Sequence, residues 1–386
     1  MAEIIPSTKN ILVVAGDPSG DLHGAALIRA LKKQDPDINV AVLGGERMRE
    51  VSDRFIYNLA GIGAAGFAEP LLRFFLWIRL IGLIRKYMDE KRPACVVTID
   101  FYGFNHQVLG LAAHRKIPAF YYVSPQVWAS RPTRALRLAR LVRRMLVIFP
   151  FEKAVYEKAG AACTFVGHPL LDIVPEPITP PENRGRDYAW KVGILPGSRA
   201  QEISRHMPLF WEAFTKVKAT FPQAKPYIFA AREVSDATLL ALCRKQAGRD
   251  VSSEVSIVRE SDYAMRKTMD IVVTSSGTAT LENAMLGIPM VVVYKMPWFT
   301  YQIAKRVVTV PYISLVNILA GKPLVKELIQ EKATADALSG QMMALINNPS
   351  TMTAMRQSLI ALRKTLGEPG VANRAAEIIT TEVFPK

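Results

Sequence analysis

The sequence predicts an α/β protein with two Rossmann-like, doubly wound parallel-sheet domains. Short apolar runs alternate with helix-like segments, and the alternation stops once, at a proline-rich stretch, before it resumes. The length of 386 residues fits two domains, because a domain commonly takes ~150 residues. Apolar residues make up 50% of the chain, enough for two cores, which excludes disordered, collagen-like and disulfide-scaffold proteins.

The first domain is expected over residues 1–168. Its strands are short apolar runs that end in turn residues or proline, as buried strands of a parallel sheet do. Helical patterns over Leu22–Lys33 and residues 107–115 separate some of them. The strands are expected at Lys9–Ala15, Val40–Gly44, Ala94–Ile99, Ile117–Val123, Arg144–Phe149 and Cys163–Val166.

Residues 169–189 are rich in proline and lack periodicity, which predicts a linker. A second domain then follows over 190–365, and the helix in 366–386 is expected to pack back on the first domain. Ligands are expected in a cleft between the two domains, at the carboxyl ends of the strands. The strands of the second domain are expected at Lys191–Leu195, Pro226–Ala230, Val255–Val258, Ile271–Thr274 and Met290–Tyr294.

The formal net charge of +15 points to an anionic partner: nucleic acid, an acidic membrane surface or a phosphorylated substrate. The 3 cysteines are far apart and predict neither disulfides nor a zinc site, as in a reducing cytosol. No secretory signal is evident at the start of the chain, so an intracellular protein is expected. The histidines lack ligand-like spacing, and no metal site is expected.

The most apolar stretch, Leu59–Ile84, is interrupted by Glu69, Pro70, Arg73 and Arg79, so a transmembrane helix is not expected. Residues 71–88 leave two interpretations open. They form either a core helix whose arginines extend past it, or a surface element that dips into an anionic leaflet. The candidate membrane contacts are Leu71, Leu72, Phe74, Phe75, Leu76 and Trp77.

Two strand ends of the second domain resemble binding sites for a nucleoside diphosphate. The segment Gly193–Arg199 places a Pro-Gly-Ser loop and an arginine at a helix start, although a plain turn with an exposed arginine would look the same. In Thr274–Glu282 small hydroxyl residues again precede a helix, and Glu282 could hold a ribose diol. The chain lacks a Walker A motif, which disfavours an NTPase. The candidate diphosphate contacts are Gly197, Ser198, Arg199, Ser276, Gly277 and Thr278.

The loops of the first domain carry carboxylates instead. The turn Gly16–Asp21 differs from GxGxxG, and its Asp17 and Asp21 would repel a pyrophosphate but suit sugar hydroxyls. Asp100 ends the strand Ala94–Ile99 and should face the cleft, unless it only caps a helix. The candidate acceptor contacts are Ser19, Gly20 and His23 in the first loop and Ser124, Gln126 and Trp128 in a later one.

Six blocks, in order, resemble bacterial lipid-A-disaccharide synthases: GDPSGD (16–21), SPQVWASR (124–131), FVGHPL (165–170), LPGSR (195–199), SGTATLE (276–282) and YISLVNILAGKPLVKELIQE (312–331). They cover nearly the whole chain. The resemblance implies an inverting glycosyltransferase of the GT-B architecture that needs no metal or other cofactor. It would transfer 2,3-diacylglucosamine from its UDP ester to 2,3-diacylglucosamine 1-phosphate (lipid X), giving the β-1,6-linked disaccharide 1-phosphate and UDP.

The resemblance also implies roles. Arg199, Ser276, Gly277, Thr278 and Glu282 would contact UDP, and Asn317 and Gln330 would face the cleft. Such enzymes sit peripherally on the cytoplasmic face of the inner membrane, which favours the membrane interpretation of 71–88 and gives the positive charge a reason. A homodimer is compatible with it.

Asp100 is the expected general base, ionised at neutral pH with an ordinary aspartate pKa of ~4. Asp17 and His23 are the rivals for that role. The chain departs from the family pattern at three positions: Asp17 replaces a glutamate, Ser130 a tryptophan and Gly103 a second aspartate.

Two other functions stay open. Another GT-B sugar-nucleotide enzyme, such as a UDP-GlcNAc 2-epimerase or an undecaprenyl-linked transferase, would share the diphosphate sites but not SPQVWA or NILAG. A basic nucleic-acid-binding protein would explain the charge, but no RRM, zinc-finger or helix-turn-helix signature is present.

Overall fold

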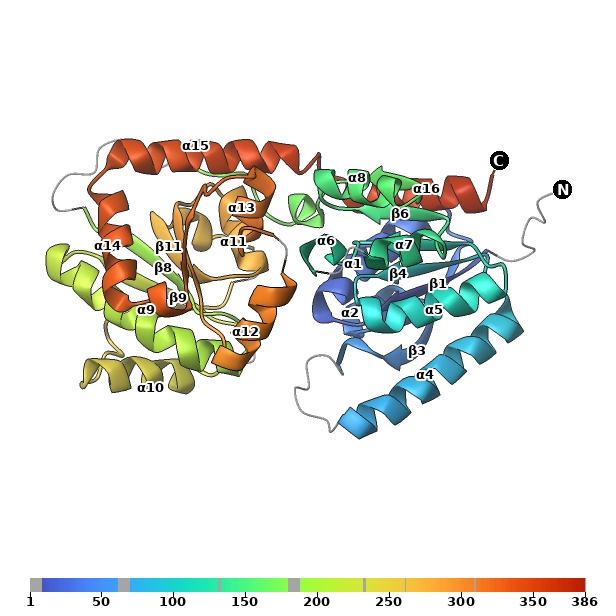
Figure 1. Ribbon diagram of the computed structural model, residues 1–386, viewed down its shortest axis with the longest axis horizontal. Coiled ribbons are helices and arrows are strands. Elements are labelled where there is room, and N and C mark those ends of the chain that lie inside the picture. Colours follow the sequence, from blue (N-terminus) through green and yellow to red (C-terminus); the bar gives the residue numbers. More distant parts are fainter. Residues whose placement is uncertain are drawn as a thin grey trace. The chain divides into compact units, whose positions relative to one another are not determined.

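The computed structural model describes residues 9–61, 70–130, 133–179, 188–231, 234–260, 262–308 and 310–385, and only the backbone of 70–74, 130, 303 and 304 (Figure 1). The chain forms two compact units. Unit 1 comprises 1–172 together with 366–386, and unit 2 comprises 173–365. Each unit contains one all-parallel sheet, which confirms the predicted α/β class.

Unit 1 has a seven-stranded sheet in the order β3-β2-β1-β4-β5-β6-β7. The order reverses between β1 and β4, which pair in register up to Ala15 and Ile99. The loops that follow these two strands therefore lie together, at the topological switch point where α/β sheets bind ligands. The strands are β1 (Asn10–Ala15), β2 (Asn39–Gly44), β3 (Arg54–Asn58), β4 (Cys95–Ile99), β5 (Ala119–Tyr122), β6 (Arg144–Val147) and β7 (Cys163–Phe165).

Helices connect these strands, and their apolar faces complete the core of unit 1. Asp17 caps the first of them: its Oδ1 accepts a hydrogen bond from the Gly20 N–H at 2.5 Å. The helices are α1 (Pro18–Gln34), α2 (Glu46–Val51), α4 (Pro70–Lys91), α5 (Tyr102–His114), α6 (Val127–Ser130), α7 (Thr133–Ala139), α8 (Pro150–Lys158), the short 3-10 helix Pro169–Asp172 and α16 (Val371–Val383).

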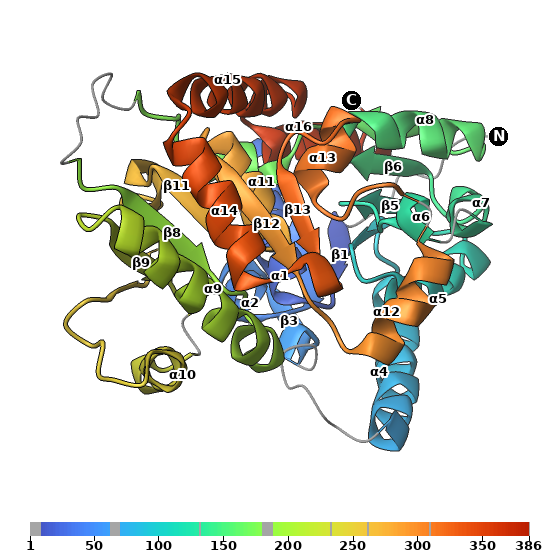
Figure 2. The same cartoon turned by 60° about the vertical axis from the view of Figure 1, so that its left-hand side comes forward.

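Unit 2 has a six-stranded sheet in the order β10-β9-β8-β11-β12-β13, which reverses between β8 and β11. Figure 2 shows β12 and β13 side by side at one edge of this sheet. The strands are β8 (Lys191–Leu195), β9 (Lys225–Phe229), β10 (Ser256–Val258), β11 (Ile271–Ser275), β12 (Met290–Tyr294) and β13 (Lys326–Ile329). The helices are α9 (Ala200–Thr220), α10 (Asp236–Ala247), α11 (Thr278–Met285), α12 (Trp298–Val307), α13 (Leu315–Ala320), α14 (Ala335–Ile346) and α15 (Pro349–Thr365), with 3-10 turns at Arg266–Thr268 and Gln330–Lys332.

The boundary between the units lies four residues later than the sequence predicts, between Asp172 and Ile173. Leu170 and Leu171 are buried in unit 1. The Asp172 carboxylate accepts hydrogen bonds from the Gly370 and Val371 N–H groups, so the start of the predicted linker is tied to the end of the chain. Residues 180–187 of the linker lie outside the described residues.

The C-terminal helix α16 belongs to unit 1, where it packs on α1. Gln34, at the end of α1, donates to the Asn373 carbonyl at 3.1 Å and accepts from the Thr380 hydroxyl at 2.8 Å. Ala375 and Ile379 of α16 are fully buried. Unit 1 is therefore built from two segments that are far apart in the sequence.

One face of helix α4 lies in the core of unit 1 and another is exposed. Leu80 and Ile84 are buried in the core of unit 1, whereas Phe75 is 60% and Ile78 55% exposed. Trp77 is half-buried and belongs to the core face, since its ring meets the Phe101 ring edge-on at 6.2 Å. Nothing is described of the side chains of Leu71, Leu72 and Phe74. None of the described helices combines the length and apolar character needed to cross a membrane.

Candidate active site

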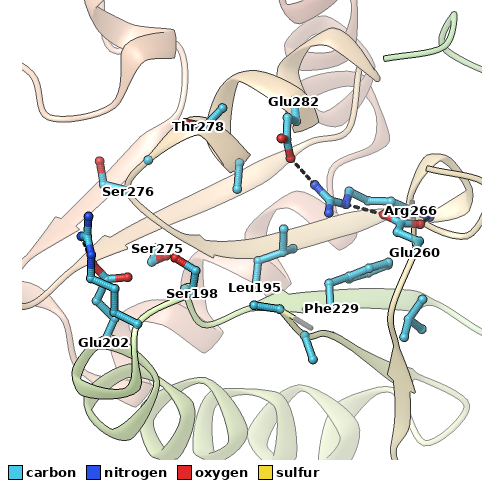
Figure 3. Close-up of a pocket in the computed structure, with 17 residues that line it drawn as sticks. Leu195, Ser198, Glu202, Phe229, Glu260, Arg266, Ser275, Ser276, Thr278 and Glu282 are labelled. Carbon is cyan, nitrogen blue, oxygen red and sulfur yellow. Dashed lines mark hydrogen bonds and ion pairs between the residues drawn. The ribbon is translucent and has the colours of Figure 1, made fainter. Parts of the chain in front are cut away.

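Unit 2 contains a pocket of about 470 Å³ at the carboxyl ends of β8, β9, β10 and β11, across the switch point of its sheet (Figure 3). The structure brings together here the residues that the two diphosphate motifs predict. They are Gly197, Ser198 and Arg199 after β8, and Ser276, Gly277, Thr278 and Glu282 after β11.

Two helices begin at this pocket without a side-chain cap. The N-cap residue of α9 is Arg199, whose side chain accepts no hydrogen bond from the helix, and that of α11 is Gly277, which has no side chain. The first N–H groups of these helices are therefore available to an anion. Gly197 lies between them with φ +113°, and a Cβ there would come within 2.7 Å of Glu202 Oε2. The diphosphate loop thus requires glycine at 197.

Arg199 supplies a cation at the rim of the pocket. Its side chain is 82% exposed, and its Nη1 lies 2.8 Å from Glu202 Oε1. Because such an exposed ion pair contributes little stability, the guanidinium can exchange Glu202 for a bound phosphate at small cost.

Arg266 organises the opposite side of the pocket and was missed in the sequence. Its Nε lies 2.7 Å from Glu260 Oε1 and its Nη1 2.5 Å from Glu282 Oε2, shown as dashed lines in Figure 3. The guanidinium also lies over the Phe229 and Tyr263 rings, 5.3 and 5.0 Å from their centroids. These contacts fix Glu282, the predicted ribose contact, in one position.

His206 joins the loops that follow β8 and β12. Its Nε2 accepts a hydrogen bond from the Lys295 N–H at 3.2 Å, so its Nδ1 carries the proton and donates to the Pro196 carbonyl at 3.0 Å. Burial lowers the pKa of His206, which keeps the ring neutral as this pair of bonds requires.

Asn317 and Gln330 do not line this pocket, and their place at the interdomain cleft stays a prediction. Asn317 is buried. Its Nδ2 donates to the Val325 carbonyl and to Glu327 Oε1, and its Oδ1 accepts from the Val325 N–H. Gln330 is also buried, and its amide exchanges two hydrogen bonds with the Met296 backbone. Both side chains hold loops in place.

In unit 1 the two predicted catalytic carboxylates follow the neighbouring strands β1 and β4. Asp100 and Phe101 both adopt left-handed backbone conformations, with φ +45° and +44°. The Asp100 carbonyl accepts hydrogen bonds from the Tyr121 hydroxyl and, at 2.8 Å, from Asn105 Nδ2, which offset the strain of that geometry. A Cβ at Gly16 would lie 2.0 Å from the Phe101 ring, so the Asp17 and Asp100 loops touch.

Asp100 is a stronger base than the sequence alone predicts. Burial, and then the nearby negative charge of Asp17, raise its pKa to about 6, against an opposing hydrogen bond from the Phe101 N–H. The rival His23 is a weaker base, because burial lowers its pKa to about 4. Its Nε2 lies 3.2 Å from the Ser19 hydroxyl.

The predicted acceptor loop is built around a carboxylate that was also missed. Glu152 is fully buried, and its Oε1 accepts from the Ser124 hydroxyl at 2.8 Å and from Trp128 Nε1 at 2.9 Å. Its Oε2 accepts from the backbone at the start of α8. Burial raises the pKa of Glu152 to about 7 despite these donors. Gln126, in the same loop, is exposed.

Comparison with known proteins places this site in context. The family model described as lipid-A-disaccharide synthetase matches residues 11–383. A lipid-A-disaccharide synthase of Trichlorobacter lovleyi is 34% identical over 379 residues, 97% of this chain and 98% of the relative. One from Anaeromyxobacter dehalogenans strain 2CP-C is 36% identical over 381 residues, 96% of each chain.

Solved structures show the same GT-B fold at much lower identity. A UDP-GlcNAc 2-epimerase from Neisseria meningitidis bound to UDP-GlcNAc matches with a TM-score of 0.63 at 12% identity, over 98% of this chain and all of the other. MurG from Acinetobacter baumannii matches with a TM-score of 0.60 at 17% identity, over 96% of this chain and 99% of the other.

Proposed function

Because the chain belongs to the lipid-A-disaccharide synthase family of glycosyltransferases, we propose that it transfers 2,3-diacylglucosamine from UDP-2,3-diacylglucosamine to 2,3-diacylglucosamine 1-phosphate (lipid X). The anomeric carbon is inverted, and the products are the β-1,6-linked disaccharide 1-phosphate and UDP. The observation that carries this proposal is the pocket of unit 2, with two uncapped helix starts and Arg199 at one side and the fixed Glu282 at the other.

In this proposal the UDP ester binds with its diphosphate against the starts of α9 and α11. Negative charge grows on the departing diphosphate as the glycosidic bond breaks. Arg199 and the helix N–H groups stabilise that charge more in the transition state than in the ground state, which accelerates transfer. Glu282 accepts hydrogen bonds from the ribose hydroxyls, and Arg266 keeps it in place.

Asp100 takes the proton from the 6-hydroxyl of lipid X as that oxygen attacks the anomeric carbon from the face opposite UDP. The bond from sugar to UDP breaks as the new bond forms, so the configuration inverts. With a pKa of about 6, Asp100 is ionised at neutral pH yet more basic than an ordinary aspartate, which suits a general base.

The protein would act on the cytoplasmic face of the inner membrane, where both lipid substrates are anchored. The exposed face of α4 supports this location, because Phe75 and Ile78 share the helix with the exposed Arg79, Arg85 and Lys86. The high positive charge of the whole chain favours the same anionic surface.

The test is UDP release on mixing UDP-2,3-diacylglucosamine with lipid X, compared with each substrate alone, with mass spectrometry of the lipid product. We expect release only with both substrates, and the same rate in EDTA. Epimerisation of UDP-N-acetylglucosamine without an acceptor would instead support a 2-epimerase. Tight binding to duplex DNA in high salt would support a nucleic-acid-binding protein.

A further inference from the structure

Exposed apolar side chains gather on a second helix, in unit 2, that the proposed function does not use. Among the described residues eleven large apolar side chains are exposed, and three of them lie on α4. Four lie in or directly after α12 (Trp298–Val307): Trp298, Phe299, Val307 and Val308. Phe299, at 77%, is the most exposed of them all, and Trp298 is 59% exposed. Their rings meet edge-on, with centroids 5.1 Å apart.

The surroundings of this aromatic pair are basic. Lys305 and Arg306 are exposed, and neither forms an ion pair within the described part of the chain. Seven residues are two turns of helix, so Lys305 lies on the face of Trp298 and Arg306 on that of Phe299. From Asn283 to Lys326 the sequence contains five lysines and arginines and not one aspartate or glutamate. The segment therefore contributes no acidic side chain of its own that would repel an anionic surface.

The helix also begins beside the nucleotide pocket. Strand β12 lies beside β11 in the parallel sheet and ends at Tyr294. Its carboxyl end is therefore at the same edge of the sheet as the predicted diphosphate loops. His206 bridges the Pro196 carbonyl and the Lys295 N–H, which ties the segment leading into α12 directly to the Pro-Gly-Ser-Arg loop. Whatever surface α12 contacts lies close to the bound donor.

We propose that α12 is a second membrane contact, in which Trp298 and Phe299 insert into an anionic phospholipid leaflet while Lys305 and Arg306 meet its headgroups. Tryptophan and other aromatic rings are enriched at the level of the lipid headgroups, and lysines and arginines close to an anionic leaflet are attracted to it. The inference rests on the proposed function in one respect, because a donor anchored by its acyl chains brings the leaflet to the nucleotide pocket.

Trp298 itself serves as the fluorescent reporter. Its signal is the difference in tryptophan emission between the wild type and Trp298→Phe. The vesicles contain phosphatidylglycerol and phosphatidylethanolamine with brominated acyl chains, which quench only tryptophans that reach the apolar layer. We expect anionic vesicles without any substrate to quench this difference signal, and phosphatidylcholine vesicles to leave it unchanged.

Variants test the surface directly. Trp298→Ser combined with Phe299→Ser should lower partitioning into anionic vesicles about tenfold, and Lys305→Gln or Arg306→Gln should lower it roughly fivefold each. Leu136→Ser is the matched control, since Leu136 is 50% exposed but lies on α7 in unit 1, and it should partition as the wild type does.

An unquenched difference signal would overturn the proposal. So would a signal that appears only when the donor is added, because α12 would then hold the acyl chains of the donor. Wild-type UDP release from both substrates dispersed in detergent is measured separately. That assay decides the proposed function whatever the vesicles show.

Discussion

At the scale of single residues, two carboxylates share the switch point of the sheet in unit 1. Asp17 and Asp100 follow adjacent parallel strands, and the charge of Asp17 is the second cause, after burial, of the raised pKa of Asp100. Asp17 also caps α1, so the same side chain both accepts a hydrogen bond at a helix start and raises the pKa of Asp100. A glutamate at 17 would extend that carboxylate by one methylene.

We predict that Asp100→Asn lowers kcat by ~10²–10⁴ and leaves UDP affinity nearly intact. In the wild type kcat should rise with pH through about 6, because the base acts only when it has lost its proton. Asp17→Asn keeps the helix cap but removes the charge that raises the pKa of Asp100, so the rise of kcat with pH should move to lower pH. Calorimetry should find Asp100→Asn no less stable at pH 8, where the wild type buries an ionised carboxylate. Normal turnover in Asp100→Asn with turnover lost in Asp17→Asn would move the base to the first loop.

A second prediction concerns Arg266. Arg266→Gln should weaken UDP binding roughly tenfold, because Glu282 loses its partner and faces the like charge of Glu260. The preference for UDP over 2′-deoxy-UDP should fall as well, since Glu282 no longer holds the ribose diol. Isothermal titration with both nucleotides measures this. Arg259→Gln is the control, as Arg259 pairs with Asp236 outside the pocket; an equal loss there would mean that only charge matters.

The residues that the sequence identified are those that stand together. Arg199 and Ser276 belong to contiguous strand–loop–helix motifs, so the sequence alone shows which residues lie beside them. Arg266 and Glu152 are single charged residues in unremarkable segments, and their partners Glu282 and Ser124 are distant in sequence. Only the folded chain shows that they meet. The raised pKa of Asp100 depends in the same way on burial and on a neighbouring loop.

At the scale of elements, α4 links a proposed membrane contact to the loop that contains Asp100. Trp77 packs edge-on against Phe101 and Phe104, which follow Asp100, at 6.2 and 5.8 Å. A Cβ at Gly103 would lie 3.3 Å from the Trp77 ring, so the missing second aspartate of the family pattern coincides with room for tryptophan. One face of α4 supports Asp100 while the other is exposed.

This division gives a third prediction. Phe75→Ser with Ile78→Ser should release the protein from anionic vesicles in flotation assays while its thermal midpoint stays unchanged, because both side chains are exposed. Trp77→Ser should instead lower the midpoint and kcat by disturbing the Asp100 loop. If the double variant unfolds at lower temperature, its two side chains are part of the core after all.

The strands that sequence reasoning missed are β3 and β13, and each lies at an edge of its sheet. In β3 every described residue is exposed or only half-buried, and in β13 Lys326 and Glu327 interrupt the apolar pattern. Edge strands are covered on fewer sides, so they lack the continuous apolar run that predicts the central strands. The central strands β1 and β11 fall within a residue of their predicted bounds, whereas β5 begins two residues later and β6 ends two residues earlier than predicted.

At the scale of the whole molecule, the last residues of the chain stabilise the unit that contains the first. Glu382 accepts hydrogen bonds from Arg143 and Arg144 of the first unit, and Arg374 donates to the Val166 carbonyl at 2.9 Å. The preceding helix α15 instead belongs to unit 2, where the buried Arg363 donates to the Val174 and Pro175 carbonyls. The chain changes units between Thr365 and Leu366.

Deletion of 367–386 should therefore destabilise unit 1 and spare unit 2. We expect a new unfolding transition at lower temperature in calorimetry, while UDP still raises the midpoint of the other transition. Removal of Pro385 and Lys386 alone is the matched control and should leave the melting curve unchanged. A single transition that moves as a whole would mean that the two units unfold together.

The return of the chain to unit 1 also sets an order of events during synthesis. Unit 2 is continuous from Ile173 to Thr365, so it folds from one uninterrupted segment. Unit 1 begins to emerge before unit 2 but needs α16, which follows unit 2 in the chain. Until then the α1 surface that α16 covers stays open. The unit that would hold the catalytic base therefore cannot be complete before α16 has been made, after the whole of unit 2, and a fragment that ends before Val371 would contain every residue of unit 2 but an unfinished unit 1.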